Sequence, residues 1–262
     1  MSDSRLLGRV ALITGASRGI GEAVARLFAA EGADLILPAR QPEALVGLQN
    51  ELAEFGRAVL IPKYDLTDRR CFPQMAQQID KRFGRLDILV ANAGVLGPLS
   101  KLSEIDDESW DHAFDINLSA NYRLLKNLDS LLRTSKAARI VFATTGATRS
   151  PGRPELGPYT ISKYALEAMA KTYAAETADT QIRINLINPG PTRTKMRATI
   201  CPQEDPLTVK TPAEVGGFFL DLCLTECPYS GEILDVVMDE GGVDKGTGVT
   251  APSFRMAVRN PS

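Results

Sequence analysis

The chain of 262 residues has little histidine and no recognisable cysteine motif. Its one histidine, His112, lies beside Trp110 in a stretch with a helical pattern. A Ser-His-Asp hydrolase needs a histidine base, and a lone histidine in such a stretch is more typical of a structural residue. The cysteine spacing matches neither a disulfide scaffold nor a zinc site. We therefore expect no metal, and reduced thiols in a cytoplasmic protein, at Cys71, Cys201, Cys223 and Cys227.

The sequence also lacks a long apolar run and an excess of positive charge. No run reaches the roughly 18–20 residues of a membrane span, and we expect no signal peptide in the polar segment before the first strand. The net charge is −2 and the pI is about 5.6, which argues against a nucleic-acid partner. Because 44% of the residues are hydrophobic and 24% are charged, we expect a soluble globular protein.

Short apolar runs alternate with helical patterns along the chain, and one long helix is predicted over about 106–133. Strands buried on both faces read as continuous apolar runs, and right-handed crossovers join them into a parallel sheet. The sequence therefore predicts an α/β fold, a single doubly wound (Rossmann) sheet of about seven strands with helices on both faces. We expect one domain over 1–262, with a core over 7–242, a lid over 191–211 and a C-terminal tail over 243–262. The tail is expected to be an arm on a neighbouring subunit or to be disordered.

A glycine-rich turn joins the first strand to the first helix, in the segment Thr14 to Gly21. Glycines allow the backbone to turn tightly and to approach a phosphate, and the helix N-terminus behind them attracts a pyrophosphate. Since the turn follows a strand and opens a helix, it predicts nucleotide binding. The residues expected to contact the cofactor here are Gly15, Ser17, Arg18, Gly19, Ile20 and Gly21.

The spacing Thr-Gly-x-x-x-Gly-x-Gly resembles the short-chain dehydrogenase/reductase family, in its small single-domain branch, over about residues 7–242. The resemblance implies that Asp65 and Leu66 meet the adenine. It implies that Asn117 anchors the water of a proton relay, and that homodimers or homotetramers form through the two long helices. It also implies that the segment after the fourth strand lines the cofactor cleft, through Asn92, Ala93 and Gly94. The segment after the sixth strand is implied to hold the nicotinamide end, through Pro189, Gly190, Thr192 and Thr194.

Tyr159 and Lys163 match the family's Tyr-x-x-x-Lys motif. Residues at i and i+4 share one face of a helix, so a lysine cation about 5 Å from the phenol would favour phenolate by roughly 3 kcal/mol. The same spacing occurs at Tyr122 and Lys126. Only Tyr159 follows the fifth strand and opens its helix, so we predict that Tyr159 and Lys163 form the catalytic and cofactor-binding pair. Tyr122 is expected to pack at a helix interface.

A third catalytic group, a hydroxyl that binds the substrate oxygen, is implied by the same resemblance. The family carries a serine 13 residues before the tyrosine, where this chain has Gly146. Thr144 and Thr145 precede it, and counting forward from the fifth strand places the serine position on Thr145. One extra residue in the loop 146–158 accounts for the shift. We therefore predict that Thr145 orients the substrate, the alternative being a strand-end threonine that binds only backbone.

The end of the second strand, Leu37-Pro38-Ala39-Arg40, carries no acid. A carboxylate there would accept the ribose hydroxyls of NAD(H), whereas an arginine accommodates the 2′-phosphate of NADP(H). Arg40 can reach that phosphate, and Arg18 in the glycine turn can contact it from the other side. The sequence therefore favours NADP(H) over NAD(H).

These features together predict an NADP(H)-dependent oxidoreductase that moves a hydride between nicotinamide and a carbonyl or alcohol carbon. The alternative is an NADP-binding sensor or scaffold with little turnover, because fold does not determine function. The Tyr-x-x-x-Lys spacing argues against an enoyl reductase, and the chain length and glycine pattern against a sugar epimerase. A basic rim would favour an anionic substrate unless it is simply a solvated face; it comprises Arg149, Arg153, Arg193, Lys195 and Arg197.

Overall fold

The computed structural model describes residues 4–149, 152–238 and 253–259. Its centre is an 8-stranded sheet with the order β3-β2-β1-β4-β5-β6-β7-β8. All pairs from β3 to β7 are parallel, which confirms the predicted doubly wound sheet. The strands are β1 (Val10–Thr14), β2 (Asp34–Ile36), β3 (Val59–Leu60), β4 (Ile88–Ala91), β5 (Arg139–Ala143), β6 (Arg183–Asn188), β7 (Ile233–Met238) and β8 (Phe254–Val258).

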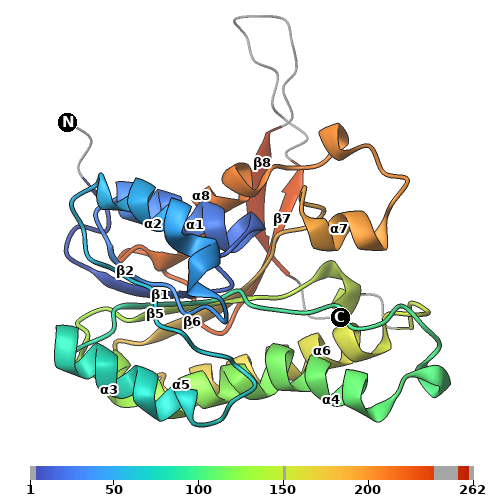
Figure 1. Ribbon diagram of the computed structural model, residues 1–262, viewed down its shortest axis with the longest axis horizontal. Helices are drawn as coiled ribbons and strands as arrows, with labels where there is room; N and C mark the ends of the chain where they lie inside the picture. The colour runs from blue at the N-terminus through green and yellow to red at the C-terminus, as the bar shows by residue number, and fades with distance from the viewer. Residues whose placement is uncertain (1–3, 150–151, 239–252, 260–262) are drawn as a thin grey trace, which may run out of the picture.

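Helices cover both faces of the sheet, as Figure 1 shows. One layer holds α1 (Gly19–Ala30), α2 (Val46–Ala53) and α8 (Pro212–Cys223). The other layer holds α3 (Cys71–Phe83), α4 (Asp107–Phe114), α5 (Ala120–Thr134) and α6 (Gly157–Glu176). Side chains of each strand alternate between the two layers. In β1, Ala11 and Ile13 pack with the α1 and α8 side, whereas Val10 and Leu12 pack with the α3 and α5 side.

The strand order reverses between β1 and β4, because the chain runs outward from β1 to β3 and then returns to β4. In open α/β sheets, ligands bind beyond the carboxyl ends of the strands at such a reversal. The glycine turn after β1 and the segment 92–94 after β4 therefore flank the crevice. The predicted lid, 191–211, contains α7 (Lys195–Ile200) and a short 3-10 turn, Pro206–Thr208.

Two features differ from the sequence expectations. The long helix predicted over 106–133 consists of α4, a π-helical segment (Asp115–Ser119) and α5. The tail was expected to be an arm or disordered, yet β8 lies within it and pairs antiparallel with β7, Leu234 opposite Val258. The prediction for the rest of the tail falls on residues outside those that the structure describes. Within the described ranges, no helix has the length and apolar character to cross a membrane.

Candidate active site

The glycine turn packs directly against the end of β4. A Cβ on Gly15, whose φ is +70°, would lie 2.9 Å from the Cα of Ala93, and a Cβ on Gly21 would lie 2.3 Å from the Gly15 carbonyl oxygen. Neither position has room for a side chain. The side-chain amide of Asn92 donates hydrogen bonds to the backbone carbonyl oxygens of Thr14 and Gly15, at 3.3 and 3.4 Å. Asn92 therefore holds the shape of the turn.

Thr14 belongs to this arrangement, although the sequence analysis assigned it no role. Its Oγ1 accepts hydrogen bonds from the backbone amides of Asn92 and Ala93, at 3.1 and 3.0 Å. The threonine thus joins the ends of β1 and β4. Its place as the first residue of the Thr-Gly-x-x-x-Gly-x-Gly motif was the signal that could have identified it.

The start of α1 is open to a ligand. No side chain caps the helix at Arg18, so its first amides are available to a phosphate. Ser17 and Arg18 are exposed, and Gly19 and Ile20 are half-buried. Arg40 is also exposed, and among the described residues neither Arg18 nor Arg40 has a hydrogen-bond or ion-pair partner. This region therefore fits a pyrophosphate with a further phosphate near two free guanidinium groups.

Asp65 and Leu66 follow β3 at the outer end of the crevice. The Asp65 carboxylate accepts hydrogen bonds from the Thr67 amide at 2.9 Å and the Thr67 hydroxyl at 2.8 Å. Leu66 packs against the core on the α3 side. Asp65 is exposed, so one carboxylate oxygen shapes the turn while the side chain still faces solvent.

Thr145, Tyr159 and Lys163 come together beyond the end of β5. Tyr159 and Lys163 lie one turn apart near the start of α6, and are 8% and 3% exposed. The Thr145 side chain lies near enough to the Tyr159 hydroxyl to favour its phenolate form, and the Thr145 Oγ1 accepts a hydrogen bond from the Ala147 amide at 3.2 Å. The Lys163 ammonium donates to the Ala143 carbonyl oxygen at 2.7 Å. Thr144 instead donates to the Glu167 carboxylate at 2.5 Å, so Thr145 is the hydroxyl that meets the tyrosine.

The electrostatics of the pair differ from the expectation. Burial raises the pKa of Tyr159 above its usual value, and the nearby Thr145 side chain only partly opposes this. The predicted lowering of the Tyr159 pKa by Lys163 is therefore wrong for this structure, because desolvation dominates and the ammonium bonds the Ala143 carbonyl. Burial lowers the pKa of Lys163 to about 8, against the opposing charge of Glu167. Lys163 is thus a cation below about pH 8.

Asn117 lies in the π-helical segment and is fully buried. Its Oδ1 accepts from the Val95 amide at 2.9 Å, and its Nδ2 donates to the Val95 carbonyl at 2.9 Å and to the Ser162 hydroxyl at 3.0 Å. The Ser162 hydroxyl donates to the Tyr159 carbonyl oxygen at 2.9 Å. Asn117 thus ties the loop after β4 to the start of α6, in a π-segment of the kind often found at functional sites.

Gly94 fits closely between two of these groups. A Cβ there would lie 3.3 Å from the Asn117 Oδ1 and 3.6 Å from the Lys163 ammonium nitrogen. The segment 92–94 after β4 is therefore adjacent to Asn117 and Lys163.

The segment after β6 closes the other side of the crevice. The Gly190 amide donates to the Asn188 side chain at 3.0 Å, and the buried Thr192 hydroxyl donates to the Gly190 carbonyl at 3.1 Å. Pro189 lies between Asn188 and Gly190. Thr194 caps α7, and its methyl group lies 3.4 Å from the position of a Cβ on Gly19. The predicted nicotinamide segment therefore reaches the glycine turn.

Comparison with known proteins agrees with this geometry. A sequence model described as short chain dehydrogenase matches residues 9–205. The chain belongs to the short chain dehydrogenase family. It is 38% identical to the oxidoreductase YciK of Escherichia coli (strain K12) over 216 residues, which cover 81% of this chain and 84% of that protein. The family assignment makes the protein an oxidoreductase of the short-chain dehydrogenase type.

Solved structures of short chain dehydrogenases also resemble this chain. A short chain dehydrogenase from Salmonella enterica serovar Typhi CT18 superposes with a TM-score of 0.86 at 35% identity, over 90% of this chain and 98% of that one. One from Escherichia coli CFT073, in complex with NADPH, gives a TM-score of 0.85 at 36% identity, over 90% of this chain and 99% of the other.

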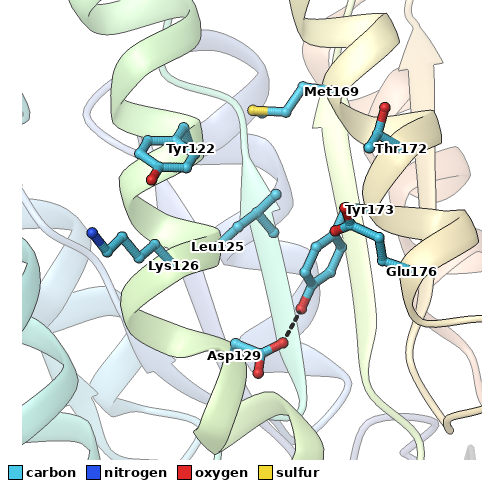
Figure 2. A pocket seen from close by; sticks show the side chains of 8 residues that line it. All are labelled: Tyr122, Leu125, Lys126, Asp129, Met169, Thr172, Tyr173 and Glu176. Atoms are coloured by element: carbon cyan, nitrogen blue, oxygen red, sulfur yellow. Dashed lines mark hydrogen bonds between the residues drawn. The ribbon is translucent and has the colours of Figure 1, made fainter.

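The second Tyr-x-x-x-Lys pair of this short chain dehydrogenase lies away from the site. Tyr122 and Lys126 line a surface hollow of about 500 Å³ between α5 and α6 (Figure 2). Tyr122 is 52% exposed. Figure 2 also shows the Tyr173 hydroxyl donating to Asp129, at 2.7 Å. Position after the fifth strand therefore distinguishes the pair in the crevice from the pair on the helix surface.

Two of the five cations of the basic rim are paired with carboxylates. Arg149 pairs with Asp235 at 3.2 Å, and Arg197 pairs with Glu204 at 2.5 Å. Arg193 donates to the Pro206 carbonyl oxygen at 2.7 Å. Arg153 and Lys195 are exposed. These contacts within the chain favour a basic rim that is solvated and partly paired internally. They argue against a rim that binds an anionic substrate.

Ser162 and Glu167 were missed by the sequence analysis. Ser162 is fully buried between Asn117 and Tyr159, and Glu167 is the charge that opposes the lowering of the Lys163 pKa. Glu167 stands four residues after Lys163, on the same helix face. That spacing was a usable signal, whereas nothing local shows that a carboxylate at this position is buried.

Proposed function

We propose that this protein is an NADP(H)-dependent oxidoreductase that transfers a hydride between nicotinamide and a carbonyl or alcohol substrate. The observation that carries the proposal is the placement of Thr145 beside the buried Tyr159, with the buried Lys163 one turn away on the same helix. A hydroxyl donor, a proton donor and a cation are thereby gathered at the carboxyl ends of the strands. These are the groups needed to polarise and protonate a carbonyl oxygen.

The preference for the phosphorylated cofactor rests on Arg18 and Arg40. Both guanidinium groups are exposed, and β2 ends without a carboxylate to bind an unmodified ribose. The NADPH complex of the similar Escherichia coli CFT073 protein supports the same choice. The glycine turn and the segment 92–94 would hold the pyrophosphate side, and Asp65 and Leu66 the adenine. Pro189, Gly190, Thr192 and Thr194 would hold the nicotinamide end.

The mechanism assigns one task to each residue of the site. NADPH supplies the hydride when it is bound. The Thr145 and Tyr159 hydroxyls donate to the substrate oxygen, and Tyr159 gives up its proton as that oxygen becomes an alkoxide. Burial raises the pKa of Tyr159 and so keeps the phenol protonated before the transfer. The Lys163 cation would stabilise the phenolate left behind. Asn117 holds the helix geometry, and a water beside it returns a proton to the tyrosine.

Replacing Thr145 tests the substrate-orienting role. Thr145→Val keeps the side-chain shape but removes the donor, so kcat/KM is expected to fall about 10²–10³-fold, as for loss of one oxyanion donor. Thr145→Ser keeps the hydroxyl and is the matched control, expected within about tenfold of the native chain. NADPH oxidation would be followed by absorbance and NADPH binding by fluorescence. Native-like turnover in Thr145→Val would remove Thr145 from the mechanism.

We also propose that the hollow between α5 and α6 (Figure 2) is covered by a second copy of this chain. The family resemblance implies oligomers through these two helices, and the exposed Tyr122 ring lies there. Tyr122→Glu would bury a charge in that contact, so light scattering is expected to report a single chain for this variant and a dimer or tetramer for the native protein. Phe55→Glu is the control, since Phe55 is exposed outside the hollow. A native protein that is monomeric would rule out the interface.

A further inference from the structure

Arg259 lies immediately after β8, and its side chain contacts residues next to Tyr159 and Lys163: Glu167 and the backbone of Thr145. Its guanidinium donates to the Glu167 carboxylate at 3.1 Å and to the Asp235 carboxylate at 2.8 Å. It also donates to the Thr145 carbonyl oxygen at 3.2 Å. The side chains of Arg259, Glu167 and Asp235 are only 11%, 9% and 2% exposed. The guanidinium is thus a buried cation shared by two carboxylates and a catalytic residue's backbone.

The Glu167 branch of these contacts holds the end of β5. Glu167 accepts hydrogen bonds from the hydroxyls of Thr144 at 2.5 Å and Thr148 at 2.8 Å. Lys163 holds the Ala143 carbonyl, and Arg259 holds the Thr145 carbonyl. Three consecutive residues, 143–145, are therefore tied to α6 or to the C-terminal strand. Movement of this segment would displace the Thr145 hydroxyl from Tyr159.

The Asp235 branch holds the segment predicted to face the nicotinamide. Asp235 accepts from the Asn188 side chain at 2.7 Å, and Asn188 in turn accepts from the Gly190 amide at 3.0 Å. Arg259 therefore connects the segment 143–145 with the segment after β6 through Glu167, Asp235 and Asn188.

The buried carboxylates of Asp235 and Glu167 need the positive charge of Arg259 beside them. Burial alone would raise the pKa of Asp235, but hydrogen bonds from Arg259 and Asn188 outweigh it and keep that pKa below its usual value. Arg149 also contacts Asp235 at 3.2 Å, but its side chain is 52% exposed, so solvent weakens its effect. Without Arg259, Glu167 would be left with Lys163 as its nearby cation. A planar guanidinium can serve both carboxylates and a carbonyl, which a lysine ammonium cannot do at once.

We infer that Arg259 is a positioning residue for catalysis: through Glu167, Asp235 and the Thr145 carbonyl it fixes both walls of the active site from the C-terminal strand. The inference rests on the proposed function for its kinetic consequence. Its structural consequence, that residues 143–149 are held rigid by Arg259, can be measured separately.

The test uses the full-length chain with three substitutions. Arg259→Met removes the charge at similar length, and Arg259→Lys keeps the charge without the planar fork. Val258→Ala is the control, because Val258 is in the same strand and its side chain is 41% exposed. We would measure kcat and KM for a carbonyl substrate that the native protein reduces, the Kd for NADPH, the melting temperature, and amide hydrogen exchange of residues 143–149.

For Arg259→Met we expect kcat to fall about 10- to 100-fold, the loss of hydrogen bonds to a charged group. The NADPH Kd should rise much less than kcat falls, because Arg259 reaches the nicotinamide segment only through Asp235 and Asn188 and leaves the glycine turn untouched. Exchange over 143–149 should accelerate, and Arg259→Lys should fall between the native chain and Arg259→Met in both measurements. If Arg259→Met does not fold, Arg259→Lys is compared with Val258→Ala instead. A lower kcat and faster exchange over 143–149 in Arg259→Lys would then support the inference, and equal values would refute it.

Native-like kcat and exchange in the Arg259 variants would overturn the inference, as would an equal kcat loss in Val258→Ala. Parallel losses of kcat and NADPH binding would also overturn it, since they indicate general loosening of the fold. If the native protein reduces no carbonyl compound, the proposed function fails. Exchange over 143–149 then decides alone: faster exchange in Arg259→Met supports the positioning role and unchanged exchange refutes it.

Discussion

Replacing Tyr159 with phenylalanine is expected to lower kcat by about 10²–10⁴-fold, the usual contribution of a positioned general acid or base. The substitution removes only the phenolic oxygen, so the ring that fills this buried position is kept. The proton for the substrate oxygen and one of the two hydroxyls that hold it are both lost. The Kd for NADPH is expected to stay within about threefold, because the phosphate contacts lie at the glycine turn.

The second Tyr-x-x-x-Lys pair offers the control for this experiment. Tyr122→Phe removes an equivalent oxygen from an exposed tyrosine outside the crevice, and its turnover is expected to match that of the native chain. Consumption of NADPH, followed by absorbance, would measure both variants. Near-native turnover in Tyr159→Phe would refute the mechanism, and NADPH binding without turnover by the native chain over a broad carbonyl panel would favour a sensor or scaffold.

Replacing Arg40 with alanine is expected to weaken NADPH binding by about 10- to 100-fold, the loss of a charge-assisted contact worth roughly 1.5–3 kcal/mol. NADH lacks the 2′-phosphate, so its Kd is expected to change by no more than about threefold. The selectivity between the two cofactors is therefore the informative quantity. Arg40 is exposed and makes no ion pair among the described residues, so its removal should leave the fold intact.

Fluorescence titration of both cofactors would measure this selectivity. Arg82→Ala is a matched control, since Arg82 lies at the end of α3 over the Phe83 ring, and both affinities should be unchanged. Arg18→Ala should act in the same direction as Arg40→Ala, because both guanidinium groups flank the expected phosphate position. Equal losses of NADPH and NADH affinity in Arg40→Ala would contradict the assignment of NADP(H).

The motif residues were predictable because the physical demand on each is local. Gly15 and Gly21 leave no room for a side chain, and the four-residue spacing of Tyr159 and Lys163 puts both on one helix face. Counting from the strand chose Thr145 over Gly146, and its role in orienting the substrate stays a prediction. Register along a buried strand is strongly specified, so counting from it locates the residue even when the following loop has changed length.

The pKa values could not be predicted in this way. Spacing indicated that Lys163 would lower the pKa of Tyr159, but burial raises it and the ammonium bonds a carbonyl oxygen instead. Desolvation depends on everything that surrounds a group, and neighbours in space are not visible in a local pattern. The pairing of Arg149 and Arg197 with carboxylates was hidden for the same reason.

The sequence by itself determined the parallel sheet and the glycine turn after β1, and it predicted which of the two Tyr-x-x-x-Lys pairs lies at the start of α6, since periodicity and short motifs encode them. Only the tertiary structure decided that the C-terminal segment adds β8 to the sheet and brings Arg259 against Glu167, 92 positions earlier in the chain. An antiparallel edge strand of five residues has too few positions for a clear pattern. A buried arginine is stable only with carboxylates beside it, and folding alone brings those carboxylates into place.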